Sequence, residues 1–309
     1  AARALPSPCA MTLADAPVDD DASDAACFYR RLLRLLLQHD LPFLVGGAYG
    51  FAHFTGIRRP TKDLDLFVRQ RDWKRLSSLA VGAGYRAELA YTHWLGKIVD
   101  EGGFADVIFN SGNGLSPVDD AWFVHATEAQ VLGLPVKLCP AEESLWTKAF
   151  IMERERYDGA DVVHLLHACA SHMDWPRLLQ RFGPHWRVLL SHLVLFGFVY
   201  PSERQRVPTA VMNELLNRLR DETHSAPPRT GHCAGTLLSR EQYLPDVTHQ
   251  GYEDPRLTEQ STMTTHEVAQ WTAAIGAAPA VAAGSGESSA DVDDTSSTPC
   301  AETARRLTR

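Results

Sequence analysis

Two stretches of sequence decide the fold: residues 46–68, GGAYGFAHFTGIRRPTKDLDLFV, and residues 104–109, FADVIF. The apolar run Phe43–Val45 leads directly into the glycine pair that opens the first stretch. This order predicts a short buried strand that ends where a helix begins. Backbone N–H groups without a neighbouring Cβ, at a helix start, favour an anion such as phosphate.

Aspartates follow the glycine pair at strand spacing. Asp63 and Asp65 alternate with leucines in a second predicted strand, so both carboxylates lie on one face of it. Asp106 has apolar neighbours on both sides, which predicts a third strand that carries a buried or coordinated carboxylate. The three aspartates can together bind a pair of divalent cations, because their carboxylates supply the oxygen ligands that Mg²⁺ prefers. The third carboxylate can also help to activate an attacking hydroxyl.

This order of motifs resembles the DNA-polymerase-β-type nucleotidyltransferase superfamily, most closely its minimal bacterial branch, which includes toxin components of abortive-infection-type systems. The resemblance implies a two-metal Mg²⁺ site on Asp63, Asp65 and Asp106, which would be the catalytic and metal-binding residues. It also implies that Gly46 and Gly47 line the triphosphate of a bound NTP, ATP included. It covers residues 40–110 and is faint beyond them.

Basic residues add candidates for nucleotide binding. Arg59 and Lys62 come immediately before the carboxylates, where a cation can contact the triphosphate or the acceptor. Lys148, with the helices at 154–166, is similar to a Lys, Arg and Asp pattern of toxin-like relatives. For Lys148 itself, the favoured interpretation is a solvated helix position.

The function implied by the resemblance is Mg²⁺-dependent transfer of an NMP from an NTP to an acceptor hydroxyl, with release of pyrophosphate. The acceptor would be an RNA end such as a tRNA, a protein or a small molecule, and an antitoxin-like protein is a conceivable partner. Ala48 replaces the Ser or Thr that many members carry after the glycine pair. A catalytically weak nucleotide-binding or partner-binding module is therefore the alternative. A metal-dependent nucleotide-sugar glycosyltransferase ranks last, since only a short ordered segment precedes the glycine pair.

The composition indicates the class of protein and the cellular compartment in which it is expected. Hydrophobic residues make up 45% and charged residues 22%, which is typical of a globular protein, and no apolar run is long enough for a membrane helix. The six cysteines form no CxxC pair, which favours a reducing, cytoplasmic compartment. The net charge of −8 is located at the two ends of the chain. Residues 1–25 contain five Asp and one Arg, and residues 253–309 contain nine acidic residues and four Arg. The remainder carries +1, which does not suggest broad duplex binding.

The predicted fold class is α+β: a small mixed nucleotidyltransferase sheet with flanking helices, followed by a helical C-terminal region. We expect a disordered segment over residues 1–24, the nucleotidyltransferase core over 25–140, a helical domain over 141–257 and a disordered tail over 258–309. Within the helical region the expected helices are Glu142–Arg154, Asp158–Ala170, Pro176–Phe182, His185–Phe198 and Pro208–Asp221. The apolar run Val188–Tyr200 is expected to be a buried helix.

Overall fold

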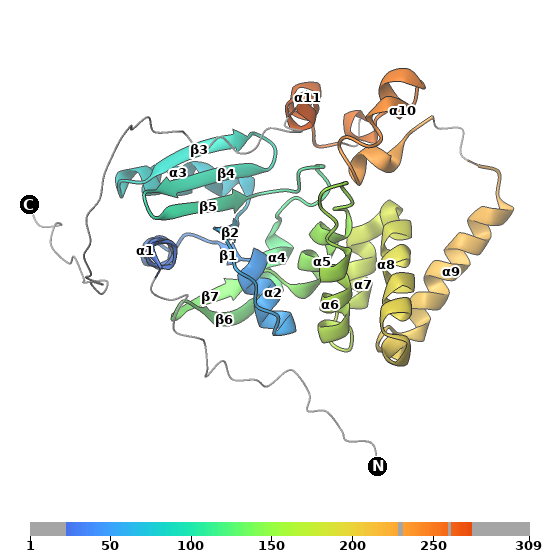
Figure 1. Cartoon of the computed structure of the whole chain (residues 1–309), viewed down its shortest axis with the longest axis horizontal. Coiled ribbons are helices and arrows are strands. Elements are labelled where there is room, and N and C mark those ends of the chain that lie inside the picture. Colours follow the sequence, from blue (N-terminus) through green and yellow to red (C-terminus); the bar gives the residue numbers. More distant parts are fainter. Residues whose placement is uncertain (1–22, 228–230, 259–260, 274–309) are drawn as a thin grey trace, which may run out of the picture.

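The computed structural model describes residues 23–227, 231–258 and 261–273. A mixed seven-stranded sheet occupies one side of the molecule, and a group of helices occupies the other (Figure 1). The strands are β1 (Leu44–Val45), β2 (Asp63–Phe67), β3 (Arg86–Tyr91), β4 (Leu95–Asp100), β5 (Gly103–Ile108), β6 (Thr127–Val131) and β7 (Leu134–Leu138). Their spatial order is β3-β4-β5-β2-β1-β7-β6. The predicted α+β class is confirmed.

The helices form three sets along the chain. The first set belongs to the sheet region: α1 (Asp24–Gln38), α2 (Gly47–Thr55), α3 (Trp73–Gly82) and α4 (Asp120–Val124). The second is the expected helical region: α5 (Ala141–Ala149), α6 (Gly159–Cys169), α7 (Trp175–Phe182), α8 (Trp186–Val199) and α9 (Thr209–His224). The third is α10 (Leu244–His249) and α11 (Thr265–Ala273). Short 3₁₀ turns lie at Gln70–Asp72, Gly183–His185, Pro201–Arg206, Ala234–Leu237 and Pro255–Leu257.

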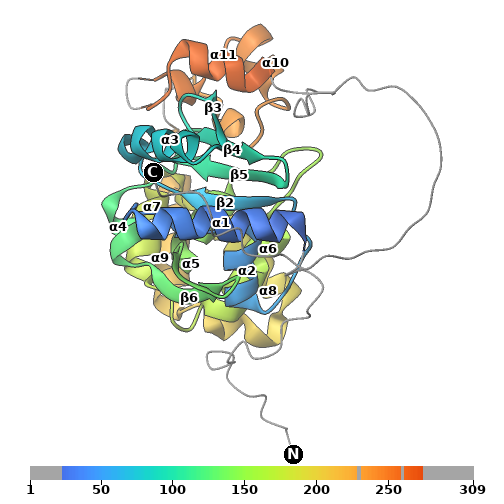
Figure 2. The same cartoon turned by 90° about the vertical axis from the view of Figure 1, so that its left-hand side faces the viewer.

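Alternation along the central strands separates the two faces of the sheet. In β2, Leu64 and Leu66 are fully buried, whereas the alternate residues Asp63, Asp65 and Phe67 are half-buried. The buried face packs against α1 and α3, and Figure 2 shows α1 lying across the sheet. Ser23 caps the start of α1, because its hydroxyl accepts a hydrogen bond from the N–H of Ala26. The other face of the sheet is left for α2, α5 and α6, and the aspartates point to that side.

Two expectations for the helical region need correction. The helix expected over Glu142–Arg154 ends at Ala149, because the chain turns there into a bridge between Met152 and Tyr157. The run Val188–Tyr200 is buried on one face only, since Phe198 of α8 is 80% exposed. Among the described residues, no helix has both the length and the apolarity to cross a bilayer.

The tail expected to be disordered from residue 258 contains α11. Thr264 and Glu267 form reciprocal hydrogen bonds at its start, a capping box that stabilises the first turn. Trp271 packs edge-on against Tyr91 and Trp94, with ring centroids 5.3 and 5.1 Å apart. This tertiary contact orders a segment whose composition alone suggested none. Residues 1–22 and 274–309 of the two expected tails lie outside the described residues.

Candidate active site

Two parallel neighbouring strands bring the three predicted aspartates together. Asp63 and Asp65 are two residues apart on the open face of β2. Asp106 of β5 is the register partner of Asp65, so the third carboxylate lies directly beside the second. Each residue offers one oxygen, and these oxygens lie within 4.8 Å of one another. The structure thus gathers an all-oxygen donor set on one patch of the sheet.

The glycine pair lies against this patch. Gly46 follows β1 and donates its N–H to the backbone oxygen of Asp65 at 3.0 Å. Gly47 begins α2 with a φ of +51°, which a residue with a side chain adopts at a cost. A Cβ on Gly47 would stand 1.6 Å from Oδ2 of Asp65. Only glycine fits here, and the backbone at the start of α2 therefore lies directly against the Asp65 carboxylate.

The electrostatics of the patch favour a bound cation. Burial raises the pKa of Asp65 from 3.8 to about 7, and the charges of Asp63 and Asp106 add to the rise. Burial also raises the pKa of Asp106, although its hydrogen bond with Lys97 counteracts this. The Lys97 ammonium, 2.6 Å from Asp106, is a positive charge already attached to the patch. Oxygen donors and an unfavourable local excess of negative charge fit a hard divalent ion such as Mg²⁺.

A cavity of about 470 Å³ opens over the aspartates. Its lining comes from both halves of the chain and includes the glycine pair, the three aspartates, Arg59 and Lys148. Lys62, the remaining predicted nucleotide-binding residue, is exposed and does not line the cavity. Lys62 lies in a bend just before β2, and its side chain is exposed to solvent. Thr61 contacts the site instead, and its hydroxyl donates to Oδ1 of Asp63 at 2.8 Å.

Lys148 belongs to a network of charges on the cavity wall. Its ammonium lies 2.9 Å from Asp158 and 2.8 Å from Asp161. Arg59 pairs with Asp161 at 2.6 Å, and Arg156 pairs with Asp158 at 3.0 Å. Burial alone would raise the pKa of Asp158, but its bonds with Arg156 and Lys148 hold that pKa below the ordinary value. Lys148 is therefore a held cation beside the cavity, and the reading of a freely solvated helix position is wrong.

Sequence reasoning missed Arg156, Asp158 and Asp161 as individual residues, although the similarity at 154–166 pointed to their segment. It also missed Lys97. That lysine is separated from Asp106 by the turn between two strands, and only the register of β4 on β5 pairs the two. The available signal was the position of Lys97 within the predicted strand Leu95–Val99, where a lysine is flanked by apolar residues.

A closing segment, residues 231–258 and 261–273, forms the far wall of the cavity. Leu237 and Leu238 line it, as do Arg240 and Trp271. Asn113, in the loop after β5, donates to the backbone oxygen of Leu237 at 2.7 Å. On the other side, the N–H of Met152 donates to the backbone oxygen of Leu238 at 3.1 Å. The segment therefore connects the sheet to the helical half across the cavity, and α11 lies beside β3 (Figures 1 and 2).

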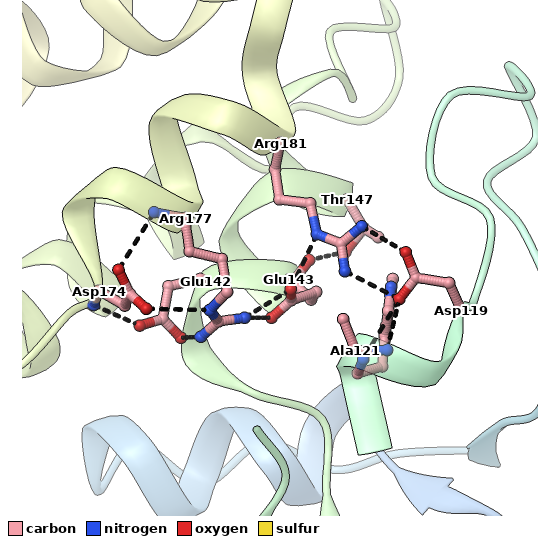
Figure 3. Close-up of polar contacts among 9 residues, drawn as sticks. Asp119, Ala121, Glu142, Glu143, Thr147, Asp174, Arg177 and Arg181 are labelled. Atoms are coloured by element: carbon pink, nitrogen blue, oxygen red, sulfur yellow. Dashed lines mark hydrogen bonds and ion pairs between the residues drawn. The ribbon is translucent and has the colours of Figure 1, made fainter. Parts of the chain in front are cut away.

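Behind the cavity, a charge network fixes α5, the helix that carries Lys148 (Figure 3). Glu143 has no solvent exposure and accepts hydrogen bonds from Arg177 at 2.5 Å and Arg181 at 3.0 Å. Arg181 also pairs with Asp119 at 2.6 Å. Asp119 in turn caps α4 through the N–H groups of Ala121 and Trp122. The network thus links α5 and α7 to the start of α4, whose Trp122 lines the cavity floor.

Comparisons with known proteins return structural neighbours only. No protein-family model and no curated protein sequence matches the chain. The antibiotic-resistance factor ANT(2'')-Ia is 17% identical, over 54% of this chain and 95% of that one, with a TM-score of 0.37. The lincomycin-bound lincosamide antibiotic adenylyltransferase LnuA is 17% identical over 45% and 93%, with a TM-score of 0.33. A nucleotidyltransferase-like protein of Paracoccidioides brasiliensis is 13% identical over 63% and 98%, with a TM-score of 0.37.

The motif order and the mixed sheet of this chain agree with its resemblance to the polymerase-β-type nucleotidyltransferase superfamily.

Proposed function

We propose that this protein transfers a nucleoside monophosphate from an NTP to an acceptor hydroxyl, with Mg²⁺, and releases pyrophosphate. One observation carries the proposal. Three carboxylate oxygens lie within 4.8 Å of one another, beside a backbone turn where a single Cβ would overlap Asp65. A structural sheet needs neither feature, whereas a metal-bound triphosphate needs both.

Different residues would bind the metal ions and the phosphates of the NTP. Asp63, Asp65 and Asp106 would hold two Mg²⁺ ions, which offset the charge on the phosphates and lower the pKa of the attacking hydroxyl. The N–H groups that follow Gly46 and Gly47, at the positive end of α2, bind phosphate oxygens.

The wall residues hold the nucleotide in place. Lys148 and Arg59 supply positive charge on the opposite wall, and Asp158 and Asp161 hold these two cations in position. Pre-organised charges of this kind stabilise a transition state without further rearrangement.

The bond changes follow from this arrangement. The acceptor oxygen forms a bond to the α-phosphorus, and the bond from that phosphorus to the bridging oxygen of the β-phosphate breaks. Pyrophosphate carries away the electron pair, and the hydroxyl proton passes to Asp106, the carboxylate on the strand farther from the glycine turn. Positioning and electrostatics supply most of the acceleration in such transfers.

Ala48 supports a second candidate, a nucleotide-binding module with little catalysis. It lines the cavity directly after the glycine pair and offers no hydroxyl to a phosphate. Such a module would be stabilised against heat by NTP with Mg²⁺ but would release no pyrophosphate.

The test is transfer of label from each α-labelled NTP to RNA, protein and small-molecule fractions of a cell extract, with pyrophosphate measured in parallel. Asp65→Asn should abolish both signals and keep the circular dichroism of the wild type. Asp221→Asn, on the exposed surface of α9, is the matched control and should retain full activity. Equal activity of wild type and Asp65→Asn would contradict the proposal, and nucleotide binding without pyrophosphate would support the binding module.

A further inference from the structure

A single row of residues crosses four strands at the level of the aspartate patch. Asp65 of β2 is in register with Asp106 of β5, which is in register with Lys97 of β4, and Lys97 is opposite Glu88 of β3. Cross-strand partners share a face of the sheet. The row therefore places Lys97 between Asp106, on the side of the cavity, and Glu88, at the edge of the sheet.

Lys97 is bound to one of its two acidic neighbours. Its Nζ donates to Oδ1 of Asp106 at 2.6 Å, and both side chains are shielded, at 20% and 17% exposure. The same ammonium lies 4.4 Å from the ring centre of Phe104, a cation–π contact that fixes it from a second side. Among the described residues, no ion pair joins Lys97 to the exposed Glu88. The lysine is directed inward, towards the patch.

We propose that Lys97 is a positioning residue for Asp106, an inference that rests on the function proposed above. A carboxylate has two oxygens and rotates about its terminal bond. With Oδ1 held by Lys97, the rotation is stopped and Oδ2 is left for a cation shared with Asp63 and Asp65. The lysine also cancels one negative charge of the three, so the patch holds its cation less tightly and keeps its geometry when the cation is absent.

This role affects the rate of the chemical step but not the affinity for the nucleotide. Lys97 is not among the cavity-lining residues, so it acts on the reaction through Asp106 and leaves nucleotide binding unchanged. Loss of its charge should slow the chemical step and tighten binding of a divalent cation. If Lys97 only supported packing, its loss would not slow the chemical step and tighten cation binding at the same time.

The experiment compares Lys97→Met, which retains the aliphatic chain over Phe104, with Lys97→Arg, which retains the charge and the donors. Lys137→Met, an exposed lysine on β7 of the same sheet, is the matched control. Mn²⁺ binding is measured by calorimetry on the full chain without NTP. kcat and KM are then measured with the best NTP and its acceptor.

Lys97→Met should lower kcat by roughly 10–100-fold, the usual effect of losing a partner of a metal ligand, with KM for NTP nearly unchanged. It should bind Mn²⁺ several-fold more tightly than the wild type, and Lys97→Arg should restore most of both values. Unchanged kcat in Lys97→Met would overturn the assignment, since Lys97 would then leave Asp106 once the cation binds. Weaker Mn²⁺ binding would also overturn it. A wild type that binds Mn²⁺ but transfers no label would refute the proposed function instead.

Discussion

Removing the negative charge of Asp65 should make the metal-free protein more stable at neutral pH while it destroys the proposed activity. In the fold, burial and two neighbouring carboxylates raise the pKa of Asp65 from 3.8 to about 7. The folded state therefore holds a proton on Asp65 more tightly than the unfolded state does. Stability from this proton is fully present below pH 3.8 and is lost as the pH rises through 7.

The size of the effect follows from the difference between the two pKa values. At 1.36 kcal/mol per pKa unit, the rise from 3.8 to about 7 corresponds to about 4 kcal/mol. The carboxylate lies at an open cavity, and solvent relaxation there reduces this to about 1–2 kcal/mol. Asp65→Asn removes the titrating charge and keeps the shape. We expect the variant to be more stable than wild type by about this amount at pH 8, and nearly equal at pH 4.

Urea unfolding followed by circular dichroism, in EDTA and at a series of pH values, measures this difference. Wild-type stability should fall between pH 4 and pH 8 by more than that of Asp65→Asn. Added Mg²⁺ at pH 8 should stabilise the wild type and leave the variant unchanged, because a bound cation replaces the proton. Parallel pH profiles for the two proteins would refute the electrostatic reasoning, since the charge of Asp65 would then be stabilised elsewhere.

Three other substitutions test separate parts of the site. Gly47→Ala should abolish transfer and cost more stability than Gly133→Ala in thermal unfolding, because both have positive φ but only the first Cβ meets an atom within 4 Å; equal losses would exclude the clash. Glu143→Gln should cost about 3–5 kcal/mol in urea unfolding, as expected for breaking a buried ion pair, and a loss below 1 kcal/mol would show that the network is dispensable. Trp271→Ala should make α11 sensitive to limited proteolysis while the sheet stays resistant, and unchanged cleavage would contradict its role as an anchor.

Local patterns predicted the half of the site that lies on adjacent segments of chain. The alternation of Asp63 and Asp65 with leucines determined which face their carboxylates share, and the apolar neighbours of Asp106 identified its strand. The glycine pair indicated a helix start, and α2 begins there. These inferences need only side-chain periodicity and backbone sterics.

The remainder depended on long-range contacts that periodicity does not encode. Lys62 lies one residue from Asp63 but in the exposed bend before the strand, whereas Lys97 reaches Asp106 only through strand register. The pairing of Lys148 with Asp161 requires the angle between two helices, which no pattern within either helix specifies. Helix α11 is ordered by Trp271 against an aromatic pair far earlier in the chain.

The closing segment has a consequence for how the protein matures. Its wall residues, from Thr236 to Trp271, are synthesised more than one hundred residues after Asp106. On the ribosome, the aspartates and the glycine turn can therefore assemble with their sheet while one side of the chamber is still missing. A nascent chain released early would carry acidic ligands exposed to any cation or nucleotide in solution, and the wall is complete only after Trp271 has been synthesised.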